Sequence, residues 1–394
     1  MLQTTTHLPA WLAARALIPA LLAACVALPA RPAEAWQPAA PPGPFFYRGL
    51  DYGSESQFGP VNVFTNVGLG VVGRLNASGR LGDIDLRDGF SQLGDAYFHP
   101  LRSIRDGYGY VGAWGLVEFV PILSGAALPN YFLHFLGEGM LTRKLEEYYE
   151  AEGLTHGWAR AAAIATMVIS QQANELVESQ TVVAADSTAD FVFNAAGIIA
   201  FCFDSFAGYF ATDSVQLYYW PGQPVVDVGD GLLFNHGEDY ILRTTLGDWT
   251  RWKLASVFGV AAVGLGVSTP IRTDEYITWG LILGGGGLPP RDYERPVRQP
   301  VFYFDHGKEE FVATEREPEE YEQASLRIYW DRQGSLLSTL DIGIEGKHFG
   351  LNIYPGLLDT GSLQLGAYAI WTRGSAAAVG LTLSLSSVVP GFRF

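Results

Sequence analysis

From about residue 236 to the end of the chain, apolar residues alternate with small or polar residues at a period of two. In "EYITWGLILG", Ile277, Trp279 and Leu281 would share one face of a strand, and Thr278 and Gly280 the other. The alternation recurs in "SLRIYW", "HFGLNIY", "GSLQLGAYAIW" and "AVGLTLSLSS". Because successive side chains of a strand point to opposite faces, this pattern predicts an antiparallel sheet of roughly eight strands with one apolar face.

The two faces of the predicted sheet differ in polarity in a way that bears on its surroundings. An apolar face opposite a small or polar face, repeated in segments of about ten residues, is what an outer-membrane barrel requires. A closed sheet also leaves no unpaired edge for lipid to meet. A soluble sheet packed on helices is the alternative, since it alternates equally well. We expect a barrel-like domain over residues 236–394, inserted in or docked on the outer membrane.

The first 35 residues have the pattern of a secretory signal peptide. Arg15 is followed by an apolar run from Ala16 to Ala30, and a small-residue stretch then ends at Ala35. The run is too short for a spanning helix, which needs about 20 residues. We expect cleavage after Ala35. The alternative is a lipobox at "LAAC", which would leave Cys25 lipidated; both alternatives predict export.

Charge and cysteine content exclude several classes of function. The formal net charge is −16, which speaks against nucleic acid as a partner, because phosphate binding needs clustered Lys and Arg. Only Cys202 and a lipidated Cys25 could remain after export. A disulfide framework within the chain and a cysteine-based metal site are therefore excluded.

The region before the sheet has helical rather than period-two spacing. Residues 36–59 are rich in Pro, Gly and Ser and predict an extended lead-in, while residues 60–215 predict a helical domain. The apolar run 191–203 is interrupted by Asn194 and followed by Asp204, which favours a buried bundle core that could lie against a membrane; spanning helices are the alternative. The expected fold class is α+β, a helical bundle followed by an antiparallel, barrel-like domain.

Three predicted helices each carry one polar stripe on an otherwise apolar body. Residues three and four apart share a helix face, so the stripes of three helices should face one another. The stripes consist of His134 and Glu138; of Gln171, Asn174, Glu175 and Glu178; and of Asp190, Asn194 and Gly197.

The stripes allow a structural interpretation and two chemical ones. In the first, Gln171, Asn174, Asn194 and Gly197 form a polar network with close helix contact, and Asp190 caps a helix start in "STAD". In the second, His134, Glu175, Glu178 and Asp190 act as catalytic acid and base groups. In the third, side chains of the stripes bind a divalent metal ion, as carboxylate sites in helical bundles do. Its ligands would be His134, Glu138, Glu178 and Asp190.

The helical segment 129–203 resembles a known family. "PNYFLHFLGEGMLTRKLEEYYEAEGL", "AAAIATMVISQQANELVES" and "STADFVFNAAGIIAF" are similar to the helical core of YfiM-like bacterial envelope lipoproteins and, more loosely, to VanZ-like membrane proteins. The shared pattern maps onto His134, Glu175 or Glu178, Asp190, Asn194 and Gly197. The resemblance implies an envelope location but no particular reaction, and it covers none of the strand-rich half.

The chain ends "PGFRF", with a terminal aromatic residue and another two positions before it. This end resembles the signal that outer-membrane barrels present to their assembly machinery. The resemblance implies two partners, outer-membrane lipid and the barrel-assembly machinery.

Three functional hypotheses follow. The first is a non-enzymatic component of the cell envelope with a structural or lipid-contacting role, whose helical domain is periplasmic. The second is a membrane-associated hydrolase that acts on lipid or cell-wall material through His134, Glu175, Glu178 and Asp190. The third is a small-ligand binder with a pocket between helices and sheet. A bound divalent metal is the only cofactor that the residues suggest.

Overall fold

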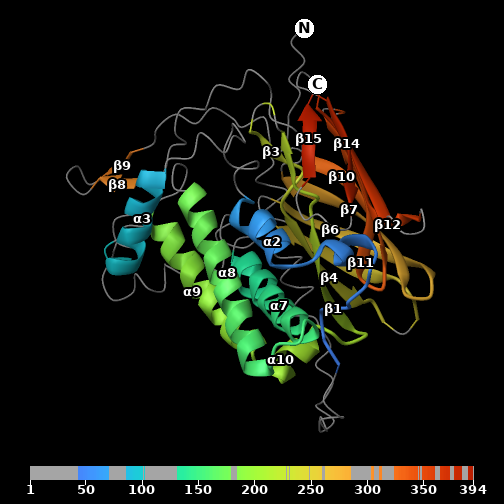
Figure 1. Cartoon of the computed structure of the whole chain (residues 1–394), viewed down its shortest axis with the longest axis horizontal. Helices are drawn as coiled ribbons and strands as arrows, with labels where there is room; N and C mark the ends of the chain where they lie inside the picture. The colour runs from blue at the N-terminus through green and yellow to red at the C-terminus, as the bar shows by residue number, and fades with distance from the viewer. Residues whose placement is uncertain are drawn as a thin grey trace.

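The structure is a computed structural model, and it combines a layer of helices with one large antiparallel sheet (Figure 1). The predicted signal peptide, Cys25 and the terminal Phe394 lie outside the residues that it describes. It describes residues 43–70, 86–100, 102, 131–178, 184–227, 229, 231–247, 249–259, 262–284, 303–305, 310–312, 324–344, 346, 348–359, 364–372, 377–383 and 389–393.

The helical layer is built around α7 (Gly139–Ala151), which packs against both α8 (His156–Glu178) and α9 (Ala184–Phe201). The π-helical turn η5 (Leu133–Glu138) runs directly into α7. Within the described residues no helix is long and apolar enough to cross a membrane. The shorter helical elements are η1 (Gly53–Gln57), α2 (Pro60–Val63), the π-helical η2 (Phe64–Gly68), α3 (Leu86–Phe98) and α10 (Asp204–Tyr209).

Ten of the described strands form a continuous antiparallel run in the order β1-β4-β5-β6-β7-β10-β11-β12-β13-β14, which β15, β2 and β3 extend. A separate hairpin pairs β8 (Tyr303–Asp305) with β9 (Glu310–Val312). The other strands are β1 (Val215–Pro221), β2 (Val225–Asp227), β3 (Leu233–Phe234), β4 (Glu238–Thr245), β5 (Lys253–Gly259), β6 (Ala262–Arg272), β7 (Glu275–Gly284), β10 (Ala324–Arg332), β11 (Ser335–Gly343), β12 (His348–Asp359), β13 (Gln364–Thr372), β14 (Ala377–Leu383) and β15 (Val389–Arg393).

The mixed fold with a large antiparallel sheet was predicted and is confirmed, but the number of strands was too low. The sheet begins at Val215, upstream of residue 236, because the short strands β1, β2 and β3 precede the long alternating segments. In the described part of the chain the sheet is open, since its order does not return from β3 to β1. Only residues 222–224 separate β1 from β2, so the chain itself connects the two ends of the sheet.

The sheet is strongly curled. Arg243 on β4 donates hydrogen bonds to Asp331 on β10, and in a flat sheet these strands would lie about 19 Å apart. Tyr354 on β12 donates to the carbonyl of Pro221 on β1 at 2.6 Å, across a flat distance of about 34 Å. The face that carries these contacts is therefore concave, and we call it the inward face.

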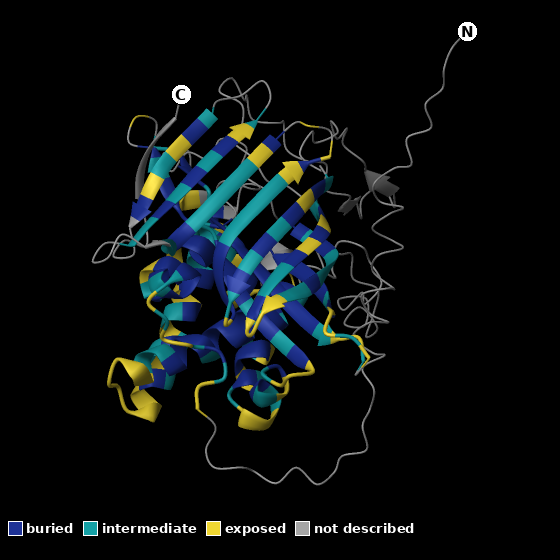
Figure 2. Cartoon of the chain, turned by 90° about the vertical axis from the view of Figure 1, so that its right-hand side faces the viewer, coloured by how far each residue is buried: buried dark blue, intermediate teal, exposed yellow. Residues whose placement is uncertain are grey.

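The helical layer covers the opposite, outward face of the sheet over β1, β4 and β5. Tyr219, Tyr240 and Phe258 lie on that face and share one buried apolar cluster with Met140 and Leu141 of α7. Burial of large apolar side chains is the main stabilising term for such a contact. The outward face of β6, β7 and β10 to β14 extends beyond this layer, and Figure 2 shows intermediate and exposed residues along the strands of the sheet.

The lead-in segment 43–59 fastens the two layers together, and we call it the strap. Glu147 of α7 accepts hydrogen bonds from the backbone amides of Phe45, Phe46 and Tyr47 at 2.8–2.9 Å. At its other end, Ser54 Oγ accepts a hydrogen bond from the amide of Leu336 on β11. The strap is therefore an ordered bridge, in part helical (η1), rather than a simply extended segment.

Candidate functional site

The polar stripes of the three helices meet as predicted by their spacing, at a buried cluster around His134. His134 and Glu138 lie at the two ends of one turn in η5, Asp190 and Asn194 lie one turn apart on α9, and Gln171 comes from α8. All five side chains are buried. We call these residues the His134 cluster.

Gly197 allows the helices to approach closely enough for this cluster to form. A Cβ atom at this position would lie 2.3 Å from the carbonyl oxygen of Phe135 in η5, well inside van der Waals contact. The backbones of α9 and η5 therefore touch, one helical turn beyond Asn194. The structure therefore places Gly197 at a close contact between helices, as the sequence predicted.

Each nitrogen of the His134 ring faces a carboxylate. Nδ1 lies 3.0 Å from Glu138 Oε1 and 2.9 Å from Asn194 Oδ1, and Nε2 lies 3.3 Å from Asp190 Oδ1. Gln171 Nε2 donates to the second oxygen of Glu138 at 2.5 Å. Since every one of these ring contacts is an acceptor, the geometry fits an imidazolium whose two N–H groups both donate.

The electrostatics of the cluster favour the same protonation state. Burial alone would lower the pKa of His134, but the negative charges of Asp190 and Glu138 and their hydrogen bonds outweigh it. The pKa of His134 is therefore raised well above its usual value of about 6.5. Burying a charged side chain is unfavourable unless the charge is paired, and the two carboxylates provide this pairing for the charged His134.

This arrangement does not fit the predicted metal site. A ligating histidine must offer a lone pair, whereas both nitrogens of His134 are directed at separate carboxylates in opposite directions. Glu138 and Asp190 thus do not converge on one point beside the ring. The side chain of Glu178, the fourth predicted ligand, lies outside the described residues.

The remaining predicted residues lie near the cluster or outside the description. Glu175 is buried on α8, one turn beyond Gln171, and Asn174 beside it is half-buried. Because α9 begins at Ala184, Asp190 lies in its second turn and contacts His134 rather than capping the helix. The predicted capping role of Asp190 was therefore wrong.

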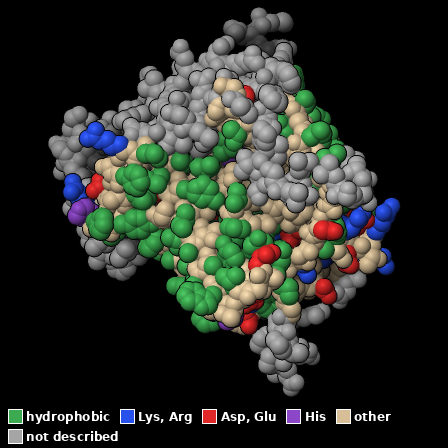
Figure 3. All heavy atoms as spheres, in the orientation of Figure 1, with side chains coloured by type: hydrophobic (Ala, Val, Ile, Leu, Met, Phe, Trp, Pro, Cys, Tyr) green, Lys and Arg blue, Asp and Glu red, His purple; other side chains and the backbone are tan. Residues whose placement is uncertain are grey.

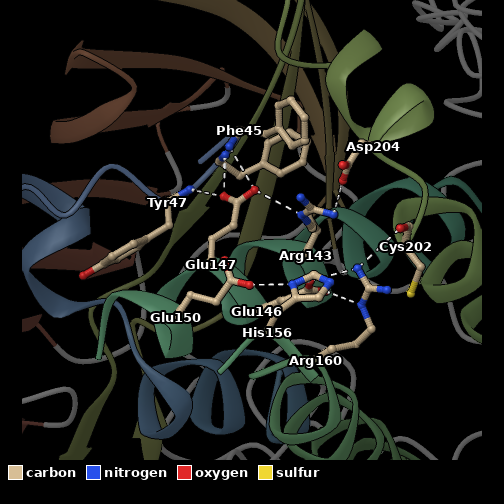
Figure 4. Close-up of polar contacts among 11 residues, drawn as sticks. Phe45, Tyr47, Arg143, Glu146, Glu147, Glu150, His156, Arg160, Cys202 and Asp204 are labelled. Atoms are coloured by element: carbon tan, nitrogen blue, oxygen red, sulfur yellow. Dashed lines mark hydrogen bonds and ion pairs between the residues drawn. The ribbon is translucent and has the colours of Figure 1, made fainter. Parts of the chain in front are cut away.

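A second polar cluster, at the end of α7, was missed by the sequence analysis (Figure 4). Arg160 donates to both oxygens of Glu146 at 2.9–3.0 Å, and His156 Nδ1 lies 2.6 Å from Glu150 and 3.3 Å from Glu146. Among the described residues, Glu146, Glu150 and His156 are the one trio whose potential metal-ligating atoms all lie within 4.8 Å of one another. Arg160 already pairs with Glu146, so the trio has a structural explanation.

Sequence spacing could not have revealed the partner of Glu147, the next residue on α7. Its carboxylate binds three strap amides and also accepts from Arg143 Nε at 3.2 Å, while Arg143 reaches Asp204 at 2.8 Å (Figure 4). The strap amides lie 100–102 residues away from Glu147 along the chain. They satisfy a buried carboxylate in the C-terminal half of α7.

The inward face of the sheet combines buried charged and hydroxyl side chains with a buried apolar cluster that includes Trp220, Ile241 and Ile282. Arg243 pairs with Asp331 and donates to Ser268 Oγ at 2.9 Å and Thr278 Oγ1 at 2.7 Å. Arg327 pairs with Asp239 and Asp341. Two inward rows cross β6, β7 and β10 to β14 by direct pairing: Ser268, Thr278, Tyr329, Thr339, Asn352, Tyr368 and Gly380; and Gly266, Gly280, Arg327, Asp341, Gly350, Ile370 and Ala378.

The outward face of the same seven strands is almost entirely apolar. Of the residues in its three rows, only Thr269 and Ser338 are polar. The rows are Val267, Trp279, Ile328, Leu340, Leu351, Ala369 and Val379; Leu265, Leu281, Leu326, Ile342, Phe349, Trp371 and Ala377; and Thr269, Ile277, Trp330, Ser338, Ile353, Ala367 and Leu381. We call these rows the outward apolar face.

Comparisons of the chain with protein-family models, with curated proteins and with solved structures give no match.

Proposed function

We propose that the chain is an exported envelope protein that contacts outer-membrane lipid through the outward apolar face, in a structural rather than an enzymatic role. Its partners in this proposal are outer-membrane lipid and, during assembly, the barrel-assembly machinery. The proposal retains the predicted signal peptide and the envelope location implied by the resemblance to YfiM-like lipoproteins.

The observation that carries the proposal is the exposed apolar face of the sheet, opposite an inward face that buries paired charges. Paired charges such as Arg243 and Asp331 are fully buried on the inward face, while Trp279, Trp371 and Leu381 are exposed on the outward face. A soluble monomer rarely exposes an apolar patch larger than a few hundred Å². An extended apolar exterior, opposite a face that buries polar and charged groups, is instead found in sheets that face lipid.

Strand length supports the same proposal. β6, β7, β10, β11, β12 and β13 contain 9–12 residues each, close to the 9–11 or so of a tilted strand in a bilayer. β1, β4 and β5, whose outward face the helices cover, contain only 7 or 8 residues. The strands whose outward face the helices leave uncovered are thus the longer ones, except for β14, which has only 7 residues.

The two alternative functions find less support. A hydrolase acting through His134 and Asp190 needs access for its substrate, yet both side chains are buried and occupied with each other. A small-ligand binder needs space between helices and sheet. The cavity at that place, between the strap, α7 and β1, has room for about one water molecule.

A pair of arginine substitutions at outward positions of similar exposure tests the proposal. Val379 is 52% exposed in the middle row, and Ile271 is 46% exposed at the end of β6 beside the turn. In lipid, Val379→Arg should cost about 2–4 kcal/mol and Ile271→Arg about 0–1. In water, both should be nearly neutral.

The measurement is the fraction of each variant that resists urea extraction from outer membranes, with heat-modifiable gel migration as a second readout. We expect Val379→Arg to lose most of the extraction-resistant fraction and Ile271→Arg to keep it. Wild-type protein that fractionates as freely soluble periplasmic material, with both variants equally stable, would refute lipid contact.

A further inference from the structure

The side of α8 that faces away from α7 carries an apolar stripe. Trp158, Val168 and Ile169 are exposed, with Ala161 and Ala165 between them at helical spacing. The charged residues of α8 lie toward its ends, since the sequence has none from Ala161 to Asn174. These 14 residues correspond to about 21 Å of helix.

α9 carries a matching stripe. Phe191, Val192, Ile199 and Phe203 are exposed, although Phe203 lies just beyond the last residue of the helix. The sequence has no charged residue between Asp190 and Asp204, a stretch of about 20 Å. Figure 3, in the orientation of Figure 1, shows hydrophobic side chains spread over the helical side of the molecule, with Lys and Arg toward its left and right edges.

The polar groups of these two helices point the other way. Gln171 on α8 and Asp190 and Asn194 on α9 belong to the buried His134 cluster. Each helix therefore turns its hydrogen-bonding groups toward its neighbours and its apolar groups outward. This is the orientation that polar residues adopt in helices surrounded by lipid.

We infer that the exposed stripes of α8 and α9 contact lipid acyl chains, so that the helical layer lies against the same membrane as the sheet without any described helix crossing it. The inference rests on the proposed function of the sheet and extends it to the helices. It replaces the expectation of a periplasmic helical domain with a second lipid-contacting surface on the opposite side of the molecule.

The composition of the stripes identifies lipid as the occupant. The uncharged stretches on α8 and α9 are about 20 Å long, which is shorter than a membrane span of about 30 Å and fits helices that contact lipid along one side. Trp158 is exposed at one end of the α8 stripe, next to His156 and Arg160, which is where tryptophan sits at a membrane interface.

Spin labels placed at single cysteines separate lipid from water and from protein. In a Cys202→Ser background, labels at Ile169→Cys and Ile199→Cys report on the helical stripes, where the native residues are 60% and 61% exposed. Leu381→Cys reports on the outward apolar face, where Leu381 is 64% exposed. Thr273→Cys, in the exposed β6–β7 turn, is the aqueous control.

The full mature chain is reconstituted in vesicles of phosphatidylethanolamine and phosphatidylglycerol, and the accessibility of each label to oxygen and to a water-soluble nickel chelate is measured. We expect labels at 169, 199 and 381 to favour oxygen by several-fold relative to the label at 273. If 169 and 199 behave like 273 while 381 favours oxygen, the inference fails and the proposed function stands.

The other outcomes are equally decisive. Labels at 169 and 199 that neither reagent reaches would show that a second copy or another protein covers the stripes, which overturns lipid as the occupant. A label at 381 that favours the nickel chelate would overturn the proposed function of the sheet, and with it the inference.

Discussion

The carboxylate of Asp190 on α9 lies 3.3 Å from Nε2 of His134 on η5, while Glu138 lies 3.0 Å from Nδ1 of the same ring. One buried histidine thus joins two helical elements through both of its nitrogens. The two carboxylates hold the ring in its charged form, and Gln171 and Asn194 complete the hydrogen bonding. The cluster therefore connects α8, α9 and η5 in the middle of the helical layer.

The first prediction concerns pH. Because the folded-state pKa of His134 is raised, its protonation stabilises the fold fully below the unfolded pKa of about 6.5, and this contribution is lost as pH rises through the folded pKa. The thermal midpoint of the wild type should fall as pH rises above about 6.5, and less steeply in His134→Gln. Parallel curves for wild type and His134→Gln would contradict the assignment.

The second prediction concerns the contact between α9 and η5. Gly197→Ala places a Cβ atom 2.3 Å from the carbonyl oxygen of Phe135, and such overpacking costs about 1–3 kcal/mol or more. Gly157→Ala in α8 is the matched control, because its Cβ would meet nothing within 4 Å. Thermal unfolding should show a lower midpoint for the first variant and an unchanged or higher one for the second. Equal midpoints would mean that the helices can separate without cost.

The third prediction concerns the buried pair on the inward face. Asp331→Asn leaves the Arg243 guanidinium without its counter-charge, which should cost about 3–5 kcal/mol. The double variant Arg243→Met/Asp331→Leu should recover most of the loss, since neither buried charge remains. Arg272→Met, which removes an exposed partner of Glu275, should change stability by about 1 kcal/mol or less. Chemical unfolding of the wild type and the three variants measures the loss and its recovery; a double variant no more stable than Asp331→Asn would argue against an unpaired buried charge as the cause.

The fourth prediction concerns the strap. Glu147→Gln exchanges one carboxylate oxygen for an NH₂ group, so the remaining carbonyl oxygen can accept from Phe45, or from Phe46 and Tyr47, but not from all three amides. The loss should be at least about 1.5–3 kcal/mol, the size of one hydrogen bond to a charged group. Hydrogen exchange at the three amides and proteolysis within residues 43–59 should both become faster. Glu152→Gln, at the exposed end of α7, should leave both rates unchanged.

The sequence by itself determined the two faces of the sheet and the residues of the His134 cluster. Both are local properties: alternation at a period of two places Trp279 and Thr278 on opposite faces, and spacing of three and four places His134 with Glu138 and Asp190 with Asn194. The polarity of each face and each stripe could therefore be predicted without knowing what lies beside it.

Only the tertiary structure decided how these surfaces meet. The helices cover the outward face over β1, β4 and β5 and leave β6 to β14 uncovered, while the strap amides reach Glu147 across about 100 residues. The ring of His134 bonds a carboxylate at each nitrogen instead of offering either one to a metal. All three features depend on contacts between residues that are far apart in the chain. A local periodicity in the sequence cannot specify which of these distant residues meet.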